Sequence, residues 1–288
     1  DKKIHTVWVS ETFPLAVARD LDRLGIDVHV RDGLFFPERE FKSDEEIKYL
    51  TQAQRTAEAG MEAAVEVLKE SKVGPKNKII WRGKPLTSEK LQEIIAEAAL
   101  RKGGIAGHTI AAGGLHAVDP HDRGSGPIPA NMPIIIDIFP RIEKTGYFGD
   151  ITRTFVKGKA TDAAWGLYEA VGKAQKAALN EITDGVASEI PHLKVHQVFR
   201  EAGYKTGRID GRMQGFYHGT GHGVGMEIHE MPRMGKQSAG LLLTGQVITV
   251  EPGLYYTEIG GVRLEDMVVV TDKRPKNLTR YPKFFEIP

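Results

Sequence analysis

The chain has 288 residues, of which 41% are hydrophobic and 27% are charged, a composition typical of a soluble globular protein. Lys and Arg number 39 against 38 Asp and Glu, so the net charge is +1 and no basic field is available to bind nucleic acid or an anionic membrane. Cys is absent, which excludes disulfides and thiolate metal sites, and no apolar run approaches the roughly 20 residues that cross a bilayer.

The first segment predicts a strand–helix–strand unit. HTVWVS at 5–10 is typical of a strand, PLAVARDLDRLG at 14–25 of a helix that ends at Gly25, and IDVHVRD at 26–32 of a second strand. This unit is too small to form a core alone. Because the chain opens at Asp1 rather than Met, we expect residues 1–36 to be the last part of an N-terminal domain that begins upstream, followed by a linker at 34–40.

Four helices are predicted after the linker. The first begins at a capping box, with Ser43 at the N-cap and Glu46 three residues later. Its apolar residues recur at spacings of three and four, as one buried face of a helix requires: Ile47, Leu50, Ala53, Ala57, Met61, Ala64 and Leu68. The other three helices are predicted at 87–104, 165–182 and 189–204.

Strand-like runs lie between these helices, at 108–114, 133–139, 151–157, 246–256 and 262–270. The order is therefore helices, strands, helices, strands. It predicts an α+β fold with an antiparallel sheet rather than repeated βαβ units. One structural unit used twice would give the same order, although the two halves share no evident sequence identity.

Acidic residues interrupt or end these apolar strands, where a lone carboxylate is costly unless it is paired or binds a cation. The acids are Asp137, Asp150, Glu251 and Glu265, with Asp266 beside the last. Taken singly, each could pair with a nearby arginine or cap a turn. Four buried anions together need more positive charge than Arg153 and Arg263 provide, and one or two divalent ions would supply it.

A histidine-rich stretch, HGTGHGVGMEIHE at 218–230, adds His218, His222 and His229. One imidazole with four carboxylates suits an oxygen-rich two-metal site for Mn²⁺, Co²⁺, Zn²⁺ or Fe²⁺. Two ions about 3.5–4 Å apart can share a water that becomes a hydroxide near neutral pH and attacks a carbonyl. Glu227 and Glu230 are interpreted as solvated or structural.

These motifs resemble those of the pita-bread metallopeptidases, which include methionine aminopeptidase, Xaa-Pro aminopeptidase, Xaa-Pro dipeptidase (prolidase) and the metal-free creatinase. The resemblance rests on GYFGDITRTF, HGTGHGVGMEIHE, VEPGLY and GGVRLED. It implies a catalytic pita-bread domain at 40–288, with a curved antiparallel sheet flanked by helices. Residues 1–36 resemble the end of the creatinase-like domain that precedes it in the proline-specific members.

The resemblance also implies roles for single residues. Asp150 and Glu265 would bridge two metal ions, Asp137 would bind one ion, and His222 with Glu251 would complete the other. His229 resembles the histidine that hydrogen-bonds the substrate and the tetrahedral intermediate, where an electrophilic donor is needed. Glu251 is also a candidate proton acceptor.

Two further residues favour the proline-specific branch. His218, four residues before His222, resembles a residue of the substrate pocket, and Arg263, two residues before Glu265, is typical of the same branch. Retention of all five metal ligands argues against a metal-free enzyme of the creatinase type.

The loop before Asp137 should provide one more substrate-side histidine. His116 and His121 are the candidates, and the spacing to Asp137 favours His121. The chain departs from the family pattern beside Asp137, where IFP replaces the usual glycine and the connection to Asp150 is two residues longer. We expect the longer connection to leave the strand pairing intact.

The function that the resemblance implies is a dinuclear exopeptidase, most favourably with Mn²⁺, that hydrolyses the bond between an N-terminal residue and proline by attack of a metal-bridging hydroxide. Its substrates would be peptides or dipeptides with proline second, and the sequence does not separate an Xaa-Pro aminopeptidase from an Xaa-Pro dipeptidase. The alternatives are a non-catalytic binding protein on this fold and a pita-bread hydrolase of methionine-aminopeptidase-like or creatinase-like specificity. A cytoplasmic homodimer is the expected form.

Overall fold

The computed structural model describes residues 4–31 and 35–288, and the contacts of the chain separate it into two compact units, Asp1–Arg39 and Glu40–Pro288. Asp32 at the end of the second predicted strand and Leu34 at the start of the predicted linker lie outside the described residues. The linker region includes a short 3₁₀ helix, η1 (Pro37–Glu40). None of the described helices is long and apolar enough to cross a bilayer.

The first unit contains the strand–helix–strand order that its sequence predicts. β1 (Thr6–Ser10) and β2 (Asp27–Arg31) pair in parallel, and α1 (Leu15–Arg23) connects them. Among the described residues of this unit only Val9 is buried. A unit with so little buried apolar surface gains little stability from a core of its own. Its assignment to a creatinase-like domain stays a prediction.

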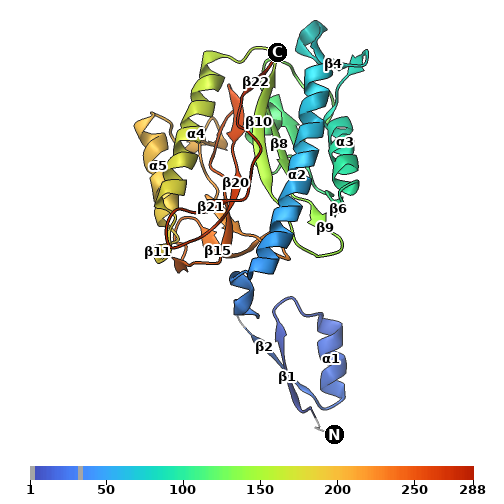
Figure 1. Cartoon of the computed structure of the whole chain (residues 1–288), viewed down its shortest axis with the longest axis vertical. Helices are drawn as coiled ribbons and strands as arrows, with labels where there is room; N and C mark the ends of the chain where they lie inside the picture. Colours follow the sequence, from blue (N-terminus) through green and yellow to red (C-terminus); the bar gives the residue numbers. More distant parts are fainter. Residues whose placement is uncertain (1–3, 32–34) are drawn as a thin grey trace. The chain divides into compact units, whose positions relative to one another are not determined.

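The second unit contains the four predicted helices: α2 (Asp44–Glu70), α3 (Ser88–Leu100), α4 (Asp162–Glu181) and α5 (Ile190–Glu201). The capping box is confirmed, because the Ser43 hydroxyl accepts from the Glu46 backbone N–H while the Glu46 carboxylate accepts from the Ser43 backbone N–H. Thr87 and Thr161 cap α3 and α4 in the same way, each through its hydroxyl. α2 packs against α3 and α4 against α5, on opposite sides of the strands in Figure 1.

Two antiparallel sheets lie between the helix pairs. The four-stranded sheet has the order β22-β10-β8-β7, in which only the terminal β22 runs parallel to its neighbour. Its strands are β7 (Ile110–Gly113), β8 (Pro133–Ile138), β10 (Ile151–Lys157) and β22 (Glu286–Ile287). The five-stranded sheet has the order β15-β14-β17-β20-β21. Its strands are β14 (Gly221–Gly223), β15 (Glu230–Met234), β17 (Val247–Val250), β20 (Asp266–Val269) and β21 (Lys276–Asn277). The predicted α+β class with antiparallel sheets is confirmed.

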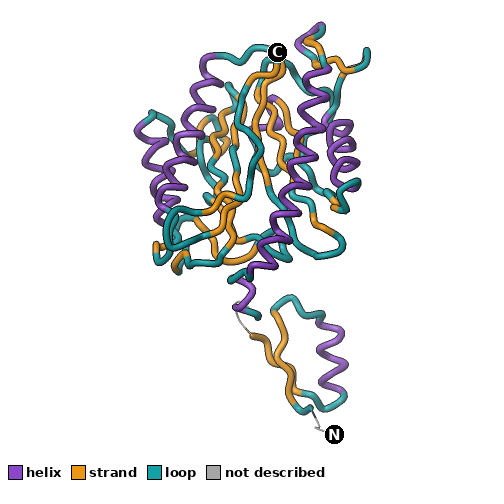
Figure 2. The backbone as a smooth tube through the Cα atoms, in the orientation of Figure 1, coloured by secondary structure: helices purple, strands orange, loops and turns teal. Residues whose placement is uncertain are grey.

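Shorter pairings complete the unit, and they lie mostly in the connections between the main elements (Figure 2). They are β3 (Lys72–Val73), β4 (Ile79–Trp81) and β5 (Lys84–Pro85); β6 (Gly104–Ile105) with β9 (Arg141–Ile142); β11 (Val186–Ala187) with β16 (Leu241–Leu242); β12 (Gly207–Ile209) with β13 (Arg212–Gln214); and β18 (Gly253–Tyr256) with β19 (Gly260–Arg263). Despite the longer connection, β8 and β10 pair without a break from Ile138 opposite Ile151 to Pro133 opposite Val156, as predicted.

Three predicted strands were drawn too long. The run 108–114 is a strand only over β7, and a 3₁₀ helix, η3 (Gly114–Val118), follows it. The run 246–256 divides into β17 and β18 at Glu251 and Pro252, and 262–270 divides into β19 and β20 at Leu264 and Glu265. Pro252 cannot donate to a ladder. The Glu251 and Glu265 N–H groups bond instead to the carbonyls of Thr220 and Thr152. The two breaks lie side by side at the edge of the five-stranded sheet, because Val250 at the end of β17 pairs with Asp266 at the start of β20.

The apolar core fills the space between helices and sheets. α2 and α3 cover the four-stranded sheet, while α4 covers strands of the other half. Fully buried side chains from both halves include Met61, Ile95, Ile136, Phe155, Leu167, Val171, Val250 and Val268. Each such side chain contributes about 1.5–3 kcal/mol of stability through removal from water. The strand ends that carry the acids are therefore held on a rigid support.

A buried ion pair joins the two sheets. Arg153 on β10 donates to the Asp266 carboxylate of β20 at 2.9 Å, with both side chains 1% exposed. The same guanidinium donates to the carbonyls of Glu265 and Tyr281. Burial raises the pKa of Asp266, but the charges of Arg153 and Lys283 hold it below its usual value. Asp266 is therefore compensated within the protein and is not part of the excess negative charge.

Loss of this pair should destabilise the fold. We expect Arg153→Met to lower the free energy of unfolding by about 3 kcal/mol, because Asp266 stays buried with Lys283 and the neutral Asn277 amide as its remaining side-chain partners. Urea denaturation followed by circular dichroism would measure the change. Arg101→Met is the matched control, since Arg101 pairs with Glu97 on the surface at 76% and 59% exposure and should change stability by under about 0.5 kcal/mol. Equal effects of the two substitutions would contradict this assignment.

Candidate metal centre

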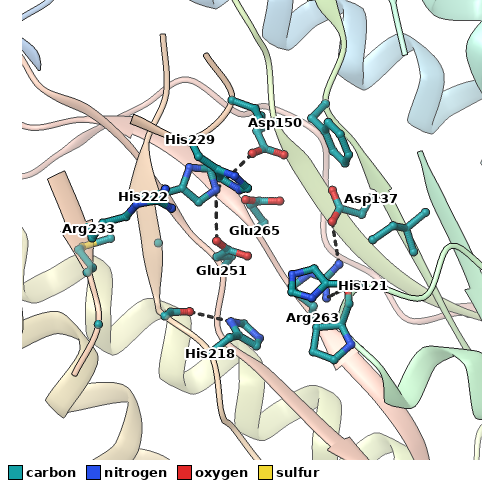
Figure 3. A pocket seen from close by; sticks show the side chains of 18 of the residues that line it. His121, Asp137, Asp150, His218, His222, His229, Arg233, Glu251, Arg263 and Glu265 are labelled. Carbon is teal, nitrogen blue, oxygen red and sulfur yellow. Dashed lines mark hydrogen bonds and ion pairs between the residues drawn. The ribbon is translucent and has the colours of Figure 1, made fainter. Parts of the chain in front are cut away.

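All five predicted metal ligands line one cavity of about 490 Å³, here called the inner pocket. They come from separate elements of both sheets: Asp137 from β8, Asp150 from the residue before β10, His222 from β14, and Glu251 and Glu265 from the breaks after β17 and before β20. His121, His218, His229 and Arg263 line the same pocket, as Figure 3 shows. The fold thus gathers residues that are up to 128 positions apart, counted from Asp137 to Glu265.

The tightest group is Asp150, His222 and Glu265, whose ligand atoms all lie within 4.8 Å of one another. His222 Nε2 is 3.6 Å from Asp150 Oδ2 and 3.4 Å from Glu251 Oε1, which brings a third carboxylate to the same imidazole. Asp137 lies across the pocket, bound to Arg263 at 2.7 Å. Its other oxygen, Oδ1, is buried and has no hydrogen-bond partner. A buried carboxylate oxygen without a donor is a natural ligand for a cation.

The electrostatics of these residues favour a bound cation. Burial raises the pKa of Asp150, and the charges of Glu265, Asp137 and Glu251 raise it further. Burial, with the charge of Glu251, likewise raises the pKa of Glu265 well above its usual value, and burial raises that of Glu251 to about 7. The one guanidinium in this group, that of Arg263, cannot balance four carboxylates. A divalent ion would remove the repulsion that these shifts reflect.

His222 has the protonation state that a ligand needs. Burial lowers its pKa to about 3, so the ring is neutral at neutral pH. Nδ1 lies 3.1 Å from the Gly223 carbonyl oxygen, which can only accept, so Nδ1 carries the proton. Nε2 therefore presents its lone pair toward Asp150 and Glu251. The donor set of one imidazole and several carboxylates fits Mn²⁺, Co²⁺, Zn²⁺ or Fe²⁺.

Two glycines position these ligands by allowing close backbone packing. A Cβ on Gly149 would lie 2.4 Å from the Ala53 carbonyl, so Asp150 can approach α2 only because residue 149 is glycine. A Cβ on Gly221 would lie 2.0 Å from the Thr249 carbonyl oxygen, which would push β14 away from β17. Glycines beside His222 thus serve close strand packing.

Residues that the sequence interpretation missed hold the acids in place. Gln54 on α2 accepts from the Asp150 N–H at 2.8 Å and donates to the Asp150 carbonyl at 2.9 Å. Thr152, directly opposite Asp137 on the neighbouring strand, donates to Glu265 Oε2 at 2.7 Å. The only feature of the sequence that could have indicated Gln54 is its position next to the apolar face of a long helix. For Thr152, the only such feature is its position two residues after Asp150.

Arg263 makes hydrogen bonds in several directions. Beside Asp137, its guanidinium donates to the Tyr255 hydroxyl at 2.9 Å and to the Pro120 carbonyl at 3.3 Å. These bonds orient Asp137 and fix the loop that carries Pro120. Direct contact between Arg263 and a substrate stays a prediction.

The predicted substrate-side histidines line the inner pocket. His218 donates through Nδ1 to the Gly219 carbonyl at 2.7 Å, and Nε2 accepts from the Tyr255 hydroxyl at 2.9 Å. Burial lowers its pKa to about 3, so this ring is neutral. His229 packs edge-on against His222, with ring centroids 4.4 Å apart, and burial lowers its pKa as well.

The choice between His116 and His121 has a clear geometry. His121 is exposed at the rim of the inner pocket, and its backbone N–H bonds Asp119 Oδ1. His116 is absent from the lining and pairs with Asp122 at 2.7 Å.

The sequence interpretation also missed Arg233 on β15, which lines the pocket and lies opposite His222 in the strand register. Glu230 forms a buried ion pair with Lys42 at 3.0 Å, as its structural interpretation expects.

Comparison with known proteins links the chain to peptidases. The family model described as metallopeptidase family M24 matches residues 48–272. An Xaa-Pro dipeptidase from Pyrococcus horikoshii is 32% identical over 248 residues, which cover 84% of this chain and 63% of that protein. A putative dipeptidase from Bacillus subtilis is 34% identical over 251 residues, 85% of this chain and 62% of the relative. The chain spans less than two thirds of the length of these curated relatives.

Solved structures give the same picture. A prolidase from Pyrococcus furiosus superposes with a TM-score of 0.82 at 27% identity, covering 97% of this chain and 77% of that one. An X-Pro aminopeptidase from Thermotoga maritima superposes with a TM-score of 0.83 at 25% identity, covering 98% and 75%.

Metal binding should become more stabilising as the pH rises. Without metal, the raised pKa values of Asp150, Glu251 and Glu265 let the folded protein keep protons that the unfolded chain has lost above pH about 4.5. Stability of the metal-free protein therefore falls between pH about 4.5 and 7, while a metal ion competes less and less with protons. The melting temperature with Mn²⁺ minus that with chelator should widen from pH 5 to pH 8, as measured by scanning fluorimetry.

Substitutions separate the site from the rest of the surface. Glu265→Gln should remove most of this widening, whereas Asp272→Asn, which removes an exposed carboxylate, should leave it unchanged. A metal-induced shift that is constant across pH in the wild-type protein would refute the carboxylate site.

Proposed function

This chain belongs to metallopeptidase family M24, and we propose that it is a metal-dependent exopeptidase that hydrolyses the bond between an N-terminal residue and a following proline. The observation that carries the proposal is the inner pocket, in which four carboxylates lie beside the neutral imidazole of His222 and the Arg263 guanidinium pairs with one of them, Asp137. The names of its relatives, Xaa-Pro dipeptidase and prolidase, support the substrate class.

Five residues would hold two divalent ions, for which Mn²⁺ is our first choice. Asp150 and Glu265 would bridge the ions, Asp137 would bind one of them, and His222 with Glu251 would complete the other. Bound ions would supply a water of lowered pKa and polarise the scissile carbonyl. The unpartnered Oδ1 of Asp137 and the lone pair on His222 Nε2 support this assignment.

Glu251 would accept the proton of the attacking water. Its carboxylate lines the inner pocket 3.4 Å from Nε2 of His222, beside the space in which the ions and their water would lie. The Thr220 carbonyl holds the Glu251 backbone N–H, so the carboxylate sits at a fixed point between two sheets. The proton it takes would pass to the amine of the departing proline.

His229 and His121 would act on the substrate itself. A neutral imidazole can donate one N–H to the oxygen of the scissile carbonyl as negative charge develops there. His229 is neutral at neutral pH because burial lowers its pKa. His121, which lines the pocket, would bond the peptide backbone near the same carbonyl.

The wall formed by His218 and Arg263, which the buried Tyr255 supports through hydrogen bonds to both, would accept the proline ring. Both nitrogens of His218 are already bonded, and the Tyr255 hydroxyl both donates and accepts. Because both ring nitrogens of His218 are occupied, the ring offers no free acceptor to an amide hydrogen of a substrate. An apolar pyrrolidine without an N–H fits such a wall better than a residue with an amide hydrogen.

The alternatives make different predictions about metal and substrate. If the chain were a non-catalytic binding protein on this fold, the purified protein would contain no bound metal even after Mn²⁺ is supplied. A hydrolase of other specificity would turn over Met-Xaa peptides or creatine faster than Xaa-Pro peptides. A homodimeric assembly and a cytoplasmic location stay predictions.

Replacement of a bridging acid should abolish both metal and turnover. We expect Asp150→Asn to lose at least one bound ion per chain and to reduce kcat/KM for Xaa-Pro substrates by about 10³-fold or more. Metal analysis of the dialysed protein and a coupled assay for released amino acid would measure the two effects. Full activity with unchanged metal content would refute the assignment of Asp150.

The two candidate loop histidines should differ in effect. His121→Gln should lower kcat/KM by about 10- to 100-fold, since it removes one hydrogen bond near the reacting carbonyl. His116→Gln should change it by less than about threefold, because an exposed pair with Asp122 contributes little. Circular dichroism would confirm that both variants fold. The reverse order of effects would transfer the substrate-side role to His116.

A further inference from the structure

A second cavity of about 600 Å³, here called the outer pocket, adjoins the inner pocket. Pro120, His121 and His218 line both cavities, so the two spaces share one boundary. The acids of the metal centre line only the inner pocket. Nothing in the function proposed above uses the outer one.

The outer pocket has its own walls. The rest of the lining comes from two parts of the chain. The first part is η3 with the loop that follows it, which provides Leu115, Val118, Asp119 and Asp122. The second part is β13 with the segment before β14, which provides Arg212, Met213 and Tyr217. Leu115 is 66% exposed and Met213 is 44% exposed. Two exposed apolar side chains that face one cavity are an unfavourable surface unless something covers them.

The hairpin that carries Arg212 and Met213 is well anchored. Its turn, Asp210 and Gly211, has φ values of 50° and 80°, as a tight two-residue hairpin turn requires. Gln214 donates to the Ile209 carbonyl and accepts from the Thr257 N–H, both at 3.0 Å. On the facing side, Tyr217 donates to the Val118 carbonyl at 3.1 Å. The pocket is therefore bounded by fixed elements.

Charges in the lining single out one residue. The Asp119 carboxylate accepts from the His121 N–H, and the Asp122 carboxylate accepts from the Gly124 N–H and pairs with His116. Arg212 is exposed and makes no ion pair with any residue of 4–31 or 35–288. The Arg212 guanidinium is thus a cationic group of the outer pocket that is available to an anionic ligand.

We propose that the outer pocket binds the residues that follow the proline, so that the substrate is a peptide of three or more residues whose terminal carboxylate faces Arg212. The inference rests on the proposed function. With proline against His218, the rest of the peptide can pass the boundary formed by Pro120, His121 and His218 into the outer pocket. One or two further residues, at about 3.3–3.6 Å each, reach into the adjoining space. Leu115, Met213 and Tyr217 then contact apolar side chains of the peptide. The enzyme is accordingly an aminopeptidase rather than a dipeptidase.

A length series tests this. Ala-Pro, Ala-Pro-Leu and Ala-Pro-Leu-amide are compared as substrates of the Mn²⁺-supplemented full chain. We expect kcat/KM for Ala-Pro-Leu to exceed that for Ala-Pro by about tenfold, and the amide to lose most of the gain, since a charge-assisted hydrogen bond is lost. Arg212→Gln should lower the ratio of tripeptide to dipeptide by a similar factor. Arg208→Gln is the matched control, because Arg208 is exposed on the same hairpin but does not line the pocket.

Cleavage of Ala-Pro alone, or an equal ratio in the Arg212 and Arg208 variants, would overturn the outer-pocket proposal while leaving the proposed function intact. If no Xaa-Pro substrate is cleaved, the proposed function fails by itself. Calorimetric binding of Ala-Pro-Leu then decides the pocket: weaker binding by Arg212→Gln than by Arg208→Gln supports it, and equal binding overturns it.

Discussion

The repulsion among four buried carboxylates is the constraint on which the rest of this structure depends. Asp137, Asp150, Glu251 and Glu265 converge where the two sheets meet, and the guanidinium of Arg263 pairs with one of them, Asp137. Burial and mutual charge raise the pKa values of three of these acids. By contrast, the fold compensates Asp266 with Arg153 and Lys283. The protein therefore neutralises an acid where charge serves structure and leaves the negative charge uncompensated where a cation is to bind.

Placement of Glu251 and Glu265 depends on interruptions of regular structure, whereas Asp137 lies within β8. Glu251 and Glu265 lie where β17 passes into β18 and β19 into β20, and their backbone N–H groups bond to Thr220 and Thr152 outside their own ladders. An acid at a break can turn toward the space between the sheets while its backbone stays bonded.

Local sequence patterns predict the helices and the acids of the site, but they do not predict where the strands break or which distant residues support the acids. Helix spans, the capping box at Ser43 and the acids in apolar strands are all readable from short windows of sequence. The strand breaks were hidden because the apolar runs around Glu251 and Glu265 are continuous, with Pro252 as the one local warning. Residues from distant segments that hold the acids in place have almost no signal in the local sequence. Gln54 lies 96 positions before Asp150, and periodicity says which face of α2 is buried but not which strand it meets.

The pocket wall and the acids belong to one polarised chain of hydrogen bonds. The Gly219 carbonyl fixes the proton of His218 on Nδ1, so Nε2 must accept from the Tyr255 hydroxyl. With its hydrogen so committed, that hydroxyl accepts from Arg263, which also donates to Asp137 Oδ2. Because Arg263 donates to both the Tyr255 hydroxyl and Asp137, the rotamer of Asp137 is coupled to the orientation of the His218 ring, which it does not touch. A ligand that moved His218 would therefore act on the acid that faces the metal-binding space, because no member of this chain can reverse its bond without leaving a buried polar atom unpaired.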